Sequence, residues 1–230
     1  MSIRKLQYQI DFVHILTFRE EYKKAILPFF GFENLEYGID NEGSINESIR
    51  LIFKNEQMAL SLRKEAMTII FEGDVKEFKN PNSPIKIFWD IYEKIKELEG
   101  YSRTIRQHLI IHAVEIGDKE NIKKILEKNP YLSLNPFGAL DEFCCVYEFK
   151  KKDIQYKLEF GNYSEKDIKK HDLTPFKTKY NEDLVNNVGL MGRLEVTEIE
   201  KNPTFNKLKT LLFESSAMLT PFSIIENEWN

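Results

Sequence analysis

Two carboxylates and a lysine in the second half of the chain have the residue types needed for metal-dependent hydrolysis. Glu148 and Lys150 flank Phe149 in an apolar, strand-like segment, and Asp141 lies upstream. Paired carboxylates can hold Mg²⁺, and a lysine can position the attacking water. Asp141, Glu148 and Lys150 are therefore the candidate catalytic residues.

The triplet Glu148-Phe149-Lys150 with Asp141 upstream resembles the acidic-pair-plus-lysine pattern of restriction-type nucleases, which implies a metal-dependent nucleic-acid-processing enzyme. Against this, the spacing from Asp141 to Glu148 is short for such nucleases, and a carboxylate-x-lysine triplet recurs at Glu21 and Glu77. A motif this common at the given composition is weak support for an activity. We expect no catalytic site here and keep the nuclease as the alternative function.

His108, His112 and Glu115 are candidate metal ligands if their segment is helical. Spacings of four and three residues would place all three on one face of a helix. On a strand the two histidines would still share a face, but Glu115 would leave it. Leu109 stands where a zinc protease would carry its catalytic glutamate. A half-buried histidine pair is the competing interpretation, and we expect no metal and no cofactor.

The two cysteines, Cys144 and Cys145, are adjacent. Neighbouring cysteines rarely form a structural disulfide, which argues for a reducing compartment. A thiol nucleophile is an alternative, but thiols in an apolar strand are usually inert. The N-terminal segment lacks the apolar core of a signal peptide, and no stretch of about 18 apolar residues exists, so we expect a soluble cytoplasmic protein.

Residues 150–180 are the most unusual stretch. The segment is locally basic in a chain with a net charge of −4, and aromatic residues alternate with its lysines. Such a surface can dock an acidic protein or track a phosphate backbone. The expected partner is another protein, and nucleic acid is the alternative. The candidate partner-binding residues are Lys150, Lys151, Lys152, Tyr156, Lys157, Lys169, Lys170, Lys177 and Lys179.

The first hundred residues show short strands and one clear helix. Alternation predicts a strand over 6–16, and a capping box at Thr17 and Glu20 predicts a helix after it. A polar loop is expected over 33–47. Three closely spaced strands over 49–54, 58–63 and 67–72 predict an antiparallel meander. Pro84 and Gly100 delimit an amphipathic helix over 84–99.

The middle segment, 103–116, is an apolar run that suits a buried strand or a buried helix. Gly117-Asp118 favours a helix that ends there, with a second helix over 119–128. These two segments resemble one ankyrin-type helix–turn–helix through Ala113, Gly117 and Ile122, but no second copy lies 33 residues away, so no ankyrin array is predicted.

The last hundred residues turn to strands again. A hairpin over 142–150 and 154–160 is followed by a long loop over 161–187, a strand within 188–200 and a helix that begins near Asn202 and Pro203.

These elements predict an α+β fold: antiparallel β-meanders packed against amphipathic helices, with a helical middle segment. We expect a single domain over 1–230, with a division into two packed halves, about 1–130 and 131–230, as a further hypothesis. The expected function is that of a non-enzymatic binding or regulatory protein acting through the lysine- and aromatic-rich segment. By analogy alone, such a chain suits an accessory protein of a bacterial or phage conflict system.

Overall fold

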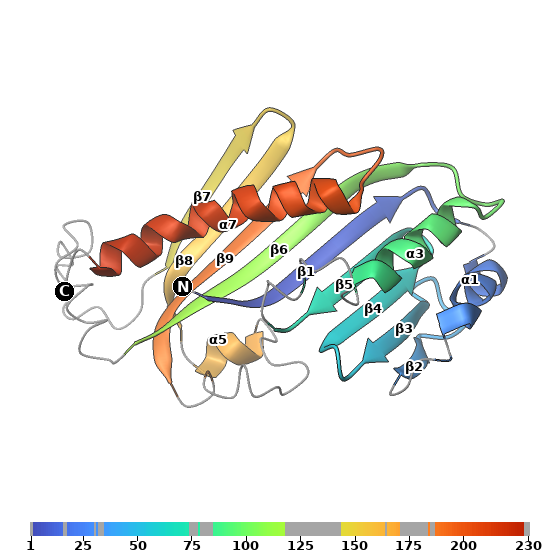
Figure 1. Cartoon of the computed structure of the whole chain (residues 1–230), viewed down its shortest axis with the longest axis horizontal. Helices are drawn as coiled ribbons and strands as arrows, with labels where there is room; N and C mark the ends of the chain where they lie inside the picture. Colours follow the sequence, from blue (N-terminus) through green and yellow to red (C-terminus); the bar gives the residue numbers. More distant parts are fainter. Residues whose placement is uncertain are drawn as a thin grey trace.

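A single antiparallel sheet of nine strands organises the chain in the computed structural model (Figure 1). The structure describes residues 2–15, 18–29, 31, 35–73, 78, 85–117, 144–163, 165–170, 184 and 187–227. The strand order is β2-β3-β4-β5-β1-β6-β9-β8-β7, and every neighbouring pair is antiparallel.

The strands are β1 (Ser2–Phe12), β2 (Leu35–Asp40), β3 (Ser48–Phe53), β4 (Met58–Arg63), β5 (Ala66–Phe71), β6 (Thr104–Gly117), β7 (Cys144–Lys151), β8 (Ile154–Tyr163) and β9 (Val188–Glu198). The helices are α1 (Phe18–Ile26), the 3₁₀ turn η1 (Leu27–Phe29), α3 (Ile85–Lys96), α5 (Glu165–Lys170) and α7 (Phe205–Asn227).

The predicted helical middle segment is wrong, and with it the predicted fold class. Residues 104–117 form β6, which pairs with β1 on one side and β9 on the other. Its apolar run is continuous because the strand lies in the middle of the sheet. In such a strand both faces carry apolar side chains, so the alternation of apolar and polar residues is weak. β-Branched residues such as Ile110, Ile111 and Val114 favour the extended conformation. The helix expected over 119–128 lies outside the described residues.

Several local predictions are confirmed. The three meander strands appear as β3, β4 and β5, the hairpin as β7 and β8, and the amphipathic helix as α3. The two loop predictions are wrong in part, because the segment 33–47 contains the edge strand β2 and the segment 161–187 contains the end of β8 and the helix α5. At the start of α7, the backbone N–H of Lys207 donates to Thr204 Oγ1 at 3.3 Å, so the helix cap is Thr204, just after Pro203.

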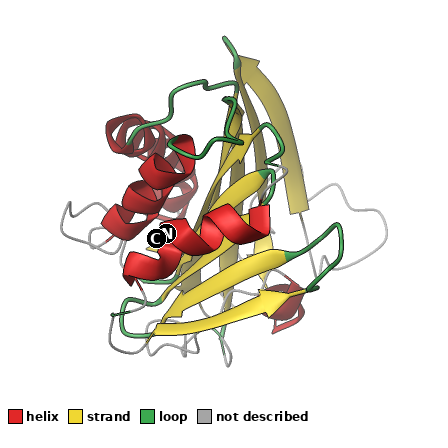
Figure 2. Cartoon of the chain, turned by 90° about the vertical axis from the view of Figure 1, so that its right-hand side faces the viewer, coloured by secondary structure: helices red, strands yellow, loops and turns green. Residues whose placement is uncertain are grey.

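Three helices, α1, α3 and α7, cover one face of the sheet, which we call the helix face. They lie in front of the strands in Figure 1, and Figure 2 shows the smaller α5 on the other side of the sheet. Alternation along β1 turns Leu6, Tyr8, Ile10 and Phe12 to the helix face, where all four are buried. The main hydrophobic core therefore lies between the sheet and these helices.

The opposite face of the sheet, which we call the polar face, carries the other half of each strand's side chains. On β1 these are Gln7, Gln9 and Asp11. A small second core closes one end of this face, where Ile168 of α5 packs with Val114, Tyr163 and Leu184. The sheet thus separates a helix-covered apolar layer from a polar surface.

The first five strands along the chain make one side of the sheet and the last four make the other, with β1 and β6 side by side at the centre. The division into two halves stays a prediction.

Candidate functional site

The polar face carries an unbroken row of polar side chains that crosses eight of the nine strands. Each member lies opposite the next in the strand register, so the row runs straight across the sheet. Its members are Arg50, Ser61, Thr68, Gln9, His108, Thr197, Gln155 and Lys150.

The centre of this row is a hydrogen-bond network around Asp11 of β1. The carboxylate accepts from Arg106 Nε at 2.7 Å and from Gln9 Nε2 at 2.6 Å, and His108 Nε2 lies 3.0 Å from it. The other ring nitrogen of His108, Nδ1, lies 2.9 Å from Thr197 Oγ1. Burial by itself raises the pKa of Asp11, but the hydrogen bonds from His108, Arg106 and Gln9 outweigh it and lower the pKa to about 2.

The order hydroxyl, imidazole and carboxylate in Thr197, His108 and Asp11 matches the order of groups that activates a hydroxyl nucleophile in hydrolases. Acyl transfer also needs N–H donors directed at the developing oxyanion. Thr197 lies in a strand that is paired on both sides, with β6 and with β8, so the neighbouring backbone N–H groups are engaged in the ladder. The network therefore fits a structural role better than a catalytic one.

We expect Asp11→Asn to lower the free energy of unfolding by about 1–2 kcal/mol at pH 7, because a carboxylate with three charge-assisted or amide donors becomes a neutral amide. The folded-state pKa of about 2 lies below the ordinary value of 3.8, so this contribution is present above pH 4 and is lost as the pH falls through 2. Urea unfolding of both proteins over this range measures it.

Asp40→Asn is the matched control. Asp40 also pairs with an arginine, Arg50, at 3.3 Å, but both side chains are exposed at the sheet edge, so the expected change is below about 1 kcal/mol. A difference between native protein and Asp11→Asn that stays constant from pH 7 to pH 2 would contradict the role given to the ionised carboxylate.

The candidate metal ligands His108, His112 and Glu115 do not come together. His108 and His112 share the polar face, but four residues of strand separate them by about 13 Å, and Glu115 turns to the other face. Both ring nitrogens of His108 already have partners. Within the described ranges, no group of three His, Cys, Asp or Glu side chains is placed to hold a metal ion.

The β7–β8 hairpin carries the remaining predicted residues. Glu148 and Lys150 both point to the polar face, where they line a hollow of about 540 Å³ with Gln155, Lys157, Glu195 and Thr197. In the register Lys157 lies between Glu148 and Glu195, and it binds Glu159 at 2.8 Å, which raises the pKa of Lys157. Asp141 lies outside the described residues.

The predicted lysines fall at opposite ends of β8. Lys150, Lys151 and Lys152 are exposed at the tip of the hairpin, which we call the basic tip; α5, with the exposed Lys170, lies at the other end of the strand (Figure 1). Ten residues of strand separate these two places by about 30 Å. Lys177 and Lys179 lie outside the described residues, as does the side chain of Lys169.

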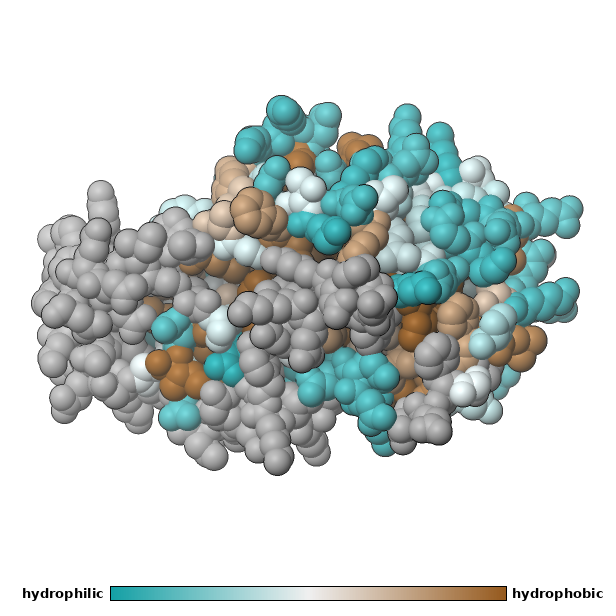
Figure 3. Space-filling view, in the orientation of Figure 1, coloured by the Kyte–Doolittle hydropathy of each residue, from teal (hydrophilic) through white to brown (hydrophobic). Residues whose placement is uncertain are grey.

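The aromatic residue predicted to contact a partner, Tyr156, is not available for it. Its ring is buried on the helix face and stacks on Phe149, with the ring centroids 5.0 Å apart and the planes at 9°. Tyr156 therefore packs beneath the hairpin, and the tip presents Lys150, Lys151 and Lys152 together with the exposed Asp153 of the turn. In the space-filling view the atoms at the tip are hydrophilic and apolar atoms lie further down the hairpin (Figure 3).

Both cysteines lie at the start of β7, and neither forms a disulfide. Cys144 is exposed, yet partial burial of its sulfur and the nearby carboxylate of Glu159 raise the pKa of its thiol. A raised pKa favours the protonated thiol, which is the unreactive form. The structure thus gives no activation to the candidate nucleophile Cys144.

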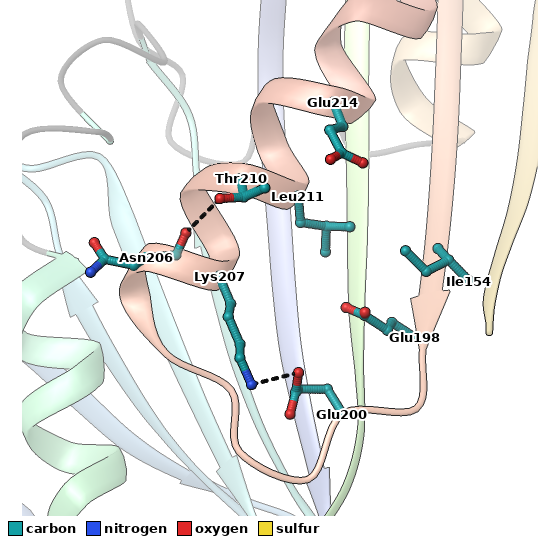
Figure 4. Close-up of a pocket in the computed structure, with 8 residues that line it drawn as sticks. All are labelled: Ile154, Glu198, Glu200, Asn206, Lys207, Thr210, Leu211 and Glu214. Carbon is teal, nitrogen blue, oxygen red and sulfur yellow. Dashed lines mark hydrogen bonds and ion pairs between the residues drawn. The ribbon is translucent and has the colours of Figure 1, made fainter. Parts of the chain in front are cut away.

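A second hollow of about 360 Å³ lies between the end of β9 and the first turns of α7 (Figure 4). Glu198, Glu200 and Glu214 line it, and Lys207 binds Glu200 at 2.8 Å. Hydrogen bonds from Lys207 and from the backbone of Asn202 keep the pKa of Glu200 below its ordinary value against the opposing effect of burial. These contacts anchor α7 to the end of β9 and account for Glu200 without a ligand.

No family model matches the chain, and no curated protein matches it. Among the described residues, no helix is both long enough and apolar enough to cross a membrane. Sequence reasoning identified the basic tip, but it missed the Asp11 network. The only signal for that network is the alternation in Gln7, Gln9 and Asp11, which indicates a polar face without naming the partners across the sheet.

Proposed function

We propose that this chain is a non-enzymatic binding protein of the cytoplasm that docks an acidic surface of another protein on its basic tip. The observation that carries the proposal is the geometry of the tip: Lys150, Lys151 and Lys152 are consecutive and exposed, the first two at the end of β7 and the third in the two-residue turn that follows. No ion pair links any of the three to a described residue, so their charges are available to a partner.

Two further features support binding over cleavage. In the strand register Lys157 lies between Glu148 and Glu195, so a basic residue occupies the position where a nuclease would hold its metal, and its ammonium group binds Glu159. The polar face carries charges of both signs, because the acidic residues Asp11 and Glu195 lie between its basic residues. Such a mixture suits contact with a protein surface better than contact with a phosphate backbone. The free thiols of Cys144 and Cys145 fit a reducing compartment.

The triple variant Lys150→Glu, Lys151→Glu, Lys152→Glu tests this function. We expect its thermal transition to be nearly unchanged, because the three side chains are exposed. The positive φ of 56° at position 152 should cost lysine and glutamate about the same, since neither is glycine. We expect co-purification of the native partner from nuclease-treated cells to be lost, and the association rate of the purified pair to fall and to lose its salt dependence.

The matched control reverses three exposed lysines on the helices, Lys23, Lys24 and Lys86. It changes the net charge by the same amount at a different place, and we expect it to retain the partner. Equal loss of the partner in both variants would show that only net charge matters. Retention of the partner by the tip variant would contradict the proposed function.

A further inference from the structure

Strand β7 is an edge strand with unusual properties for an edge. It is eight residues long and pairs with β8 in an unbroken register. The described residues place no strand on its other side. Edge strands are normally shortened, bulged or interrupted by proline, because their free N–H and C=O groups can pair with another chain. None of these three features is present in β7.

The register identifies the backbone groups that face outward. Lys151 and Ile154 flank the two-residue turn, and the residues that flank such a turn form a hydrogen-bonded pair. Hydrogen-bonded and non-hydrogen-bonded pairs then alternate along an antiparallel ladder. The N–H groups of Tyr147 and Phe149 therefore face β8, and those of Val146, Glu148 and Lys150 face away from it.

The middle of β7 carries three exposed apolar side chains and Glu148, and one end of the strand is cationic. Val146, Tyr147 and Phe149 are 53%, 51% and 43% exposed, with Val146 on the polar face and the two aromatic rings on the helix face. Lys150 and Lys151 follow directly, one on each face. An extended segment that pairs along β7 would contact the apolar side chains of Val146, Tyr147 and Phe149, with Glu148 among them, and lysines at its end.

We propose that β7 accepts an extended segment of the partner protein as a tenth, antiparallel strand, with acidic residues at the N-terminal end of that segment opposite Lys150 and Lys151. The inference rests on the proposed function and adds its binding mode. Main-chain hydrogen bonds hold the added strand, and the apolar and basic side chains of β7 select its sequence.

A second copy of this chain fits the same edge less well. Antiparallel pairing of two β7 strands over their full length would place Lys150 and Lys151 opposite Cys145 and Cys144 of the other copy, which carry no negative charge. The charge pattern of β7 therefore favours an acidic segment.

The experiment uses the full chain and a synthetic peptide of about ten residues, with three glutamates at its N-terminal end followed by alternating valine and threonine. Backbone amide exchange measured by NMR reports the contact. We expect the peptide to slow exchange at Val146, Glu148 and Lys150, whose N–H groups face outward. Tyr147 and Phe149 should change little, because their N–H groups already pair with β8.

Glu148→Pro removes an outward donor and leaves the β7–β8 ladder intact, and Glu148→Ala removes the carboxylate side chain but keeps the backbone N–H. We expect Glu148→Pro to bind the peptide about tenfold more weakly than Glu148→Ala, since a lost backbone hydrogen bond and the added ring each weaken pairing. Val146→Pro repeats the test at a second outward position. Phe149→Pro removes an N–H group that pairs with β8. This variant therefore measures how much peptide binding falls when the hairpin itself is disrupted.

The inference is overturned if the native chain does not bind the peptide, if Glu148→Pro binds as well as Glu148→Ala, or if the outward amides are unaffected. A doubled mass in solution that Glu148→Pro abolishes would assign the edge to a second copy and would also overturn it. A further outcome is that the triple lysine-to-glutamate variant loses the native partner while Glu148→Pro keeps it. That result would support docking on the basic tip and would show that strand addition is wrong.

Discussion

Replacing Phe88 with alanine is expected to lower the free energy of unfolding by about 3–5 kcal/mol, the cost typical of removing a buried aromatic side chain. Phe88 is fully buried between α3 and the sheet. Its ring lies edge-on to Tyr8 of the central strand β1, with the centroids 5.6 Å apart, and contacts Trp89 at 5.3 Å. The cavity would therefore open where α3 is attached to the middle of the sheet.

Urea unfolding followed by circular dichroism measures the loss, and Phe213→Ala is the matched control. Phe213 is also a helical phenylalanine, but it is 70% exposed on α7, so its removal should change the free energy of unfolding by less than about 0.5 kcal/mol. Equal losses in the two variants would contradict the placement of the core between α3 and β1.

Gly189→Ala is the second large expected effect, a destabilisation of about 1–3 kcal/mol from overpacking. Gly189 lies near the start of β9, where a Cβ would overlap the backbone carbonyl of Glu115 and approach the Tyr163 ring to 2.7 Å. The carbonyl belongs to the ladder between β6 and β9 and cannot move aside without disturbing it. A glycine within a strand often marks a close approach of this kind.

Gly38→Ala provides the comparison, because Gly38 is also a strand glycine but an added Cβ there meets nothing within 4 Å. We expect Gly38→Ala to be neutral or slightly stabilising, since alanine restricts the unfolded chain. Thermal melts of both variants separate the two cases. A harmless Gly189→Ala would mean that β6 and β9 are farther apart at this point than the structure places them.

Local signals in the sequence predicted the elements whose structure depends on local contacts. The strands β3, β4 and β5 are joined by short turns, and α3 carries its own stop signal at Gly100, so each could be identified from a few neighbouring residues. Segment 104–117 could not be identified in this way, because its extended conformation comes from pairing with β1 and β9, and both strands lie far from it in the sequence. Tertiary pairing here overrides a local helix stop at Gly117.

The candidate site also contains features that local sequence predicts and features that it does not. The basic tip follows from three consecutive lysines that end β7 and enter the hairpin turn, which is a local pattern. The contact between Asp11 and His108 joins residues 97 positions apart and depends on the register of β1 against β6, which no local pattern specifies. Likewise, the separation of Lys150 from Lys170 depends on β8 being straight and ten residues long, which composition alone cannot give.

The central position of β1 has a consequence for the order of folding during synthesis. The first 71 residues contain β1 to β5, so this side of the sheet can assemble as soon as it leaves the ribosome. The other edge of β1 then stays open until residues 104–117 emerge, and the pairing of β1 with β6 closes a loop of about a hundred residues. Such distant pairing is slow, so the nascent chain spends time with a long edge exposed. Chaperone contact and aggregation should concentrate in that interval, before β6 covers the strand that was made first.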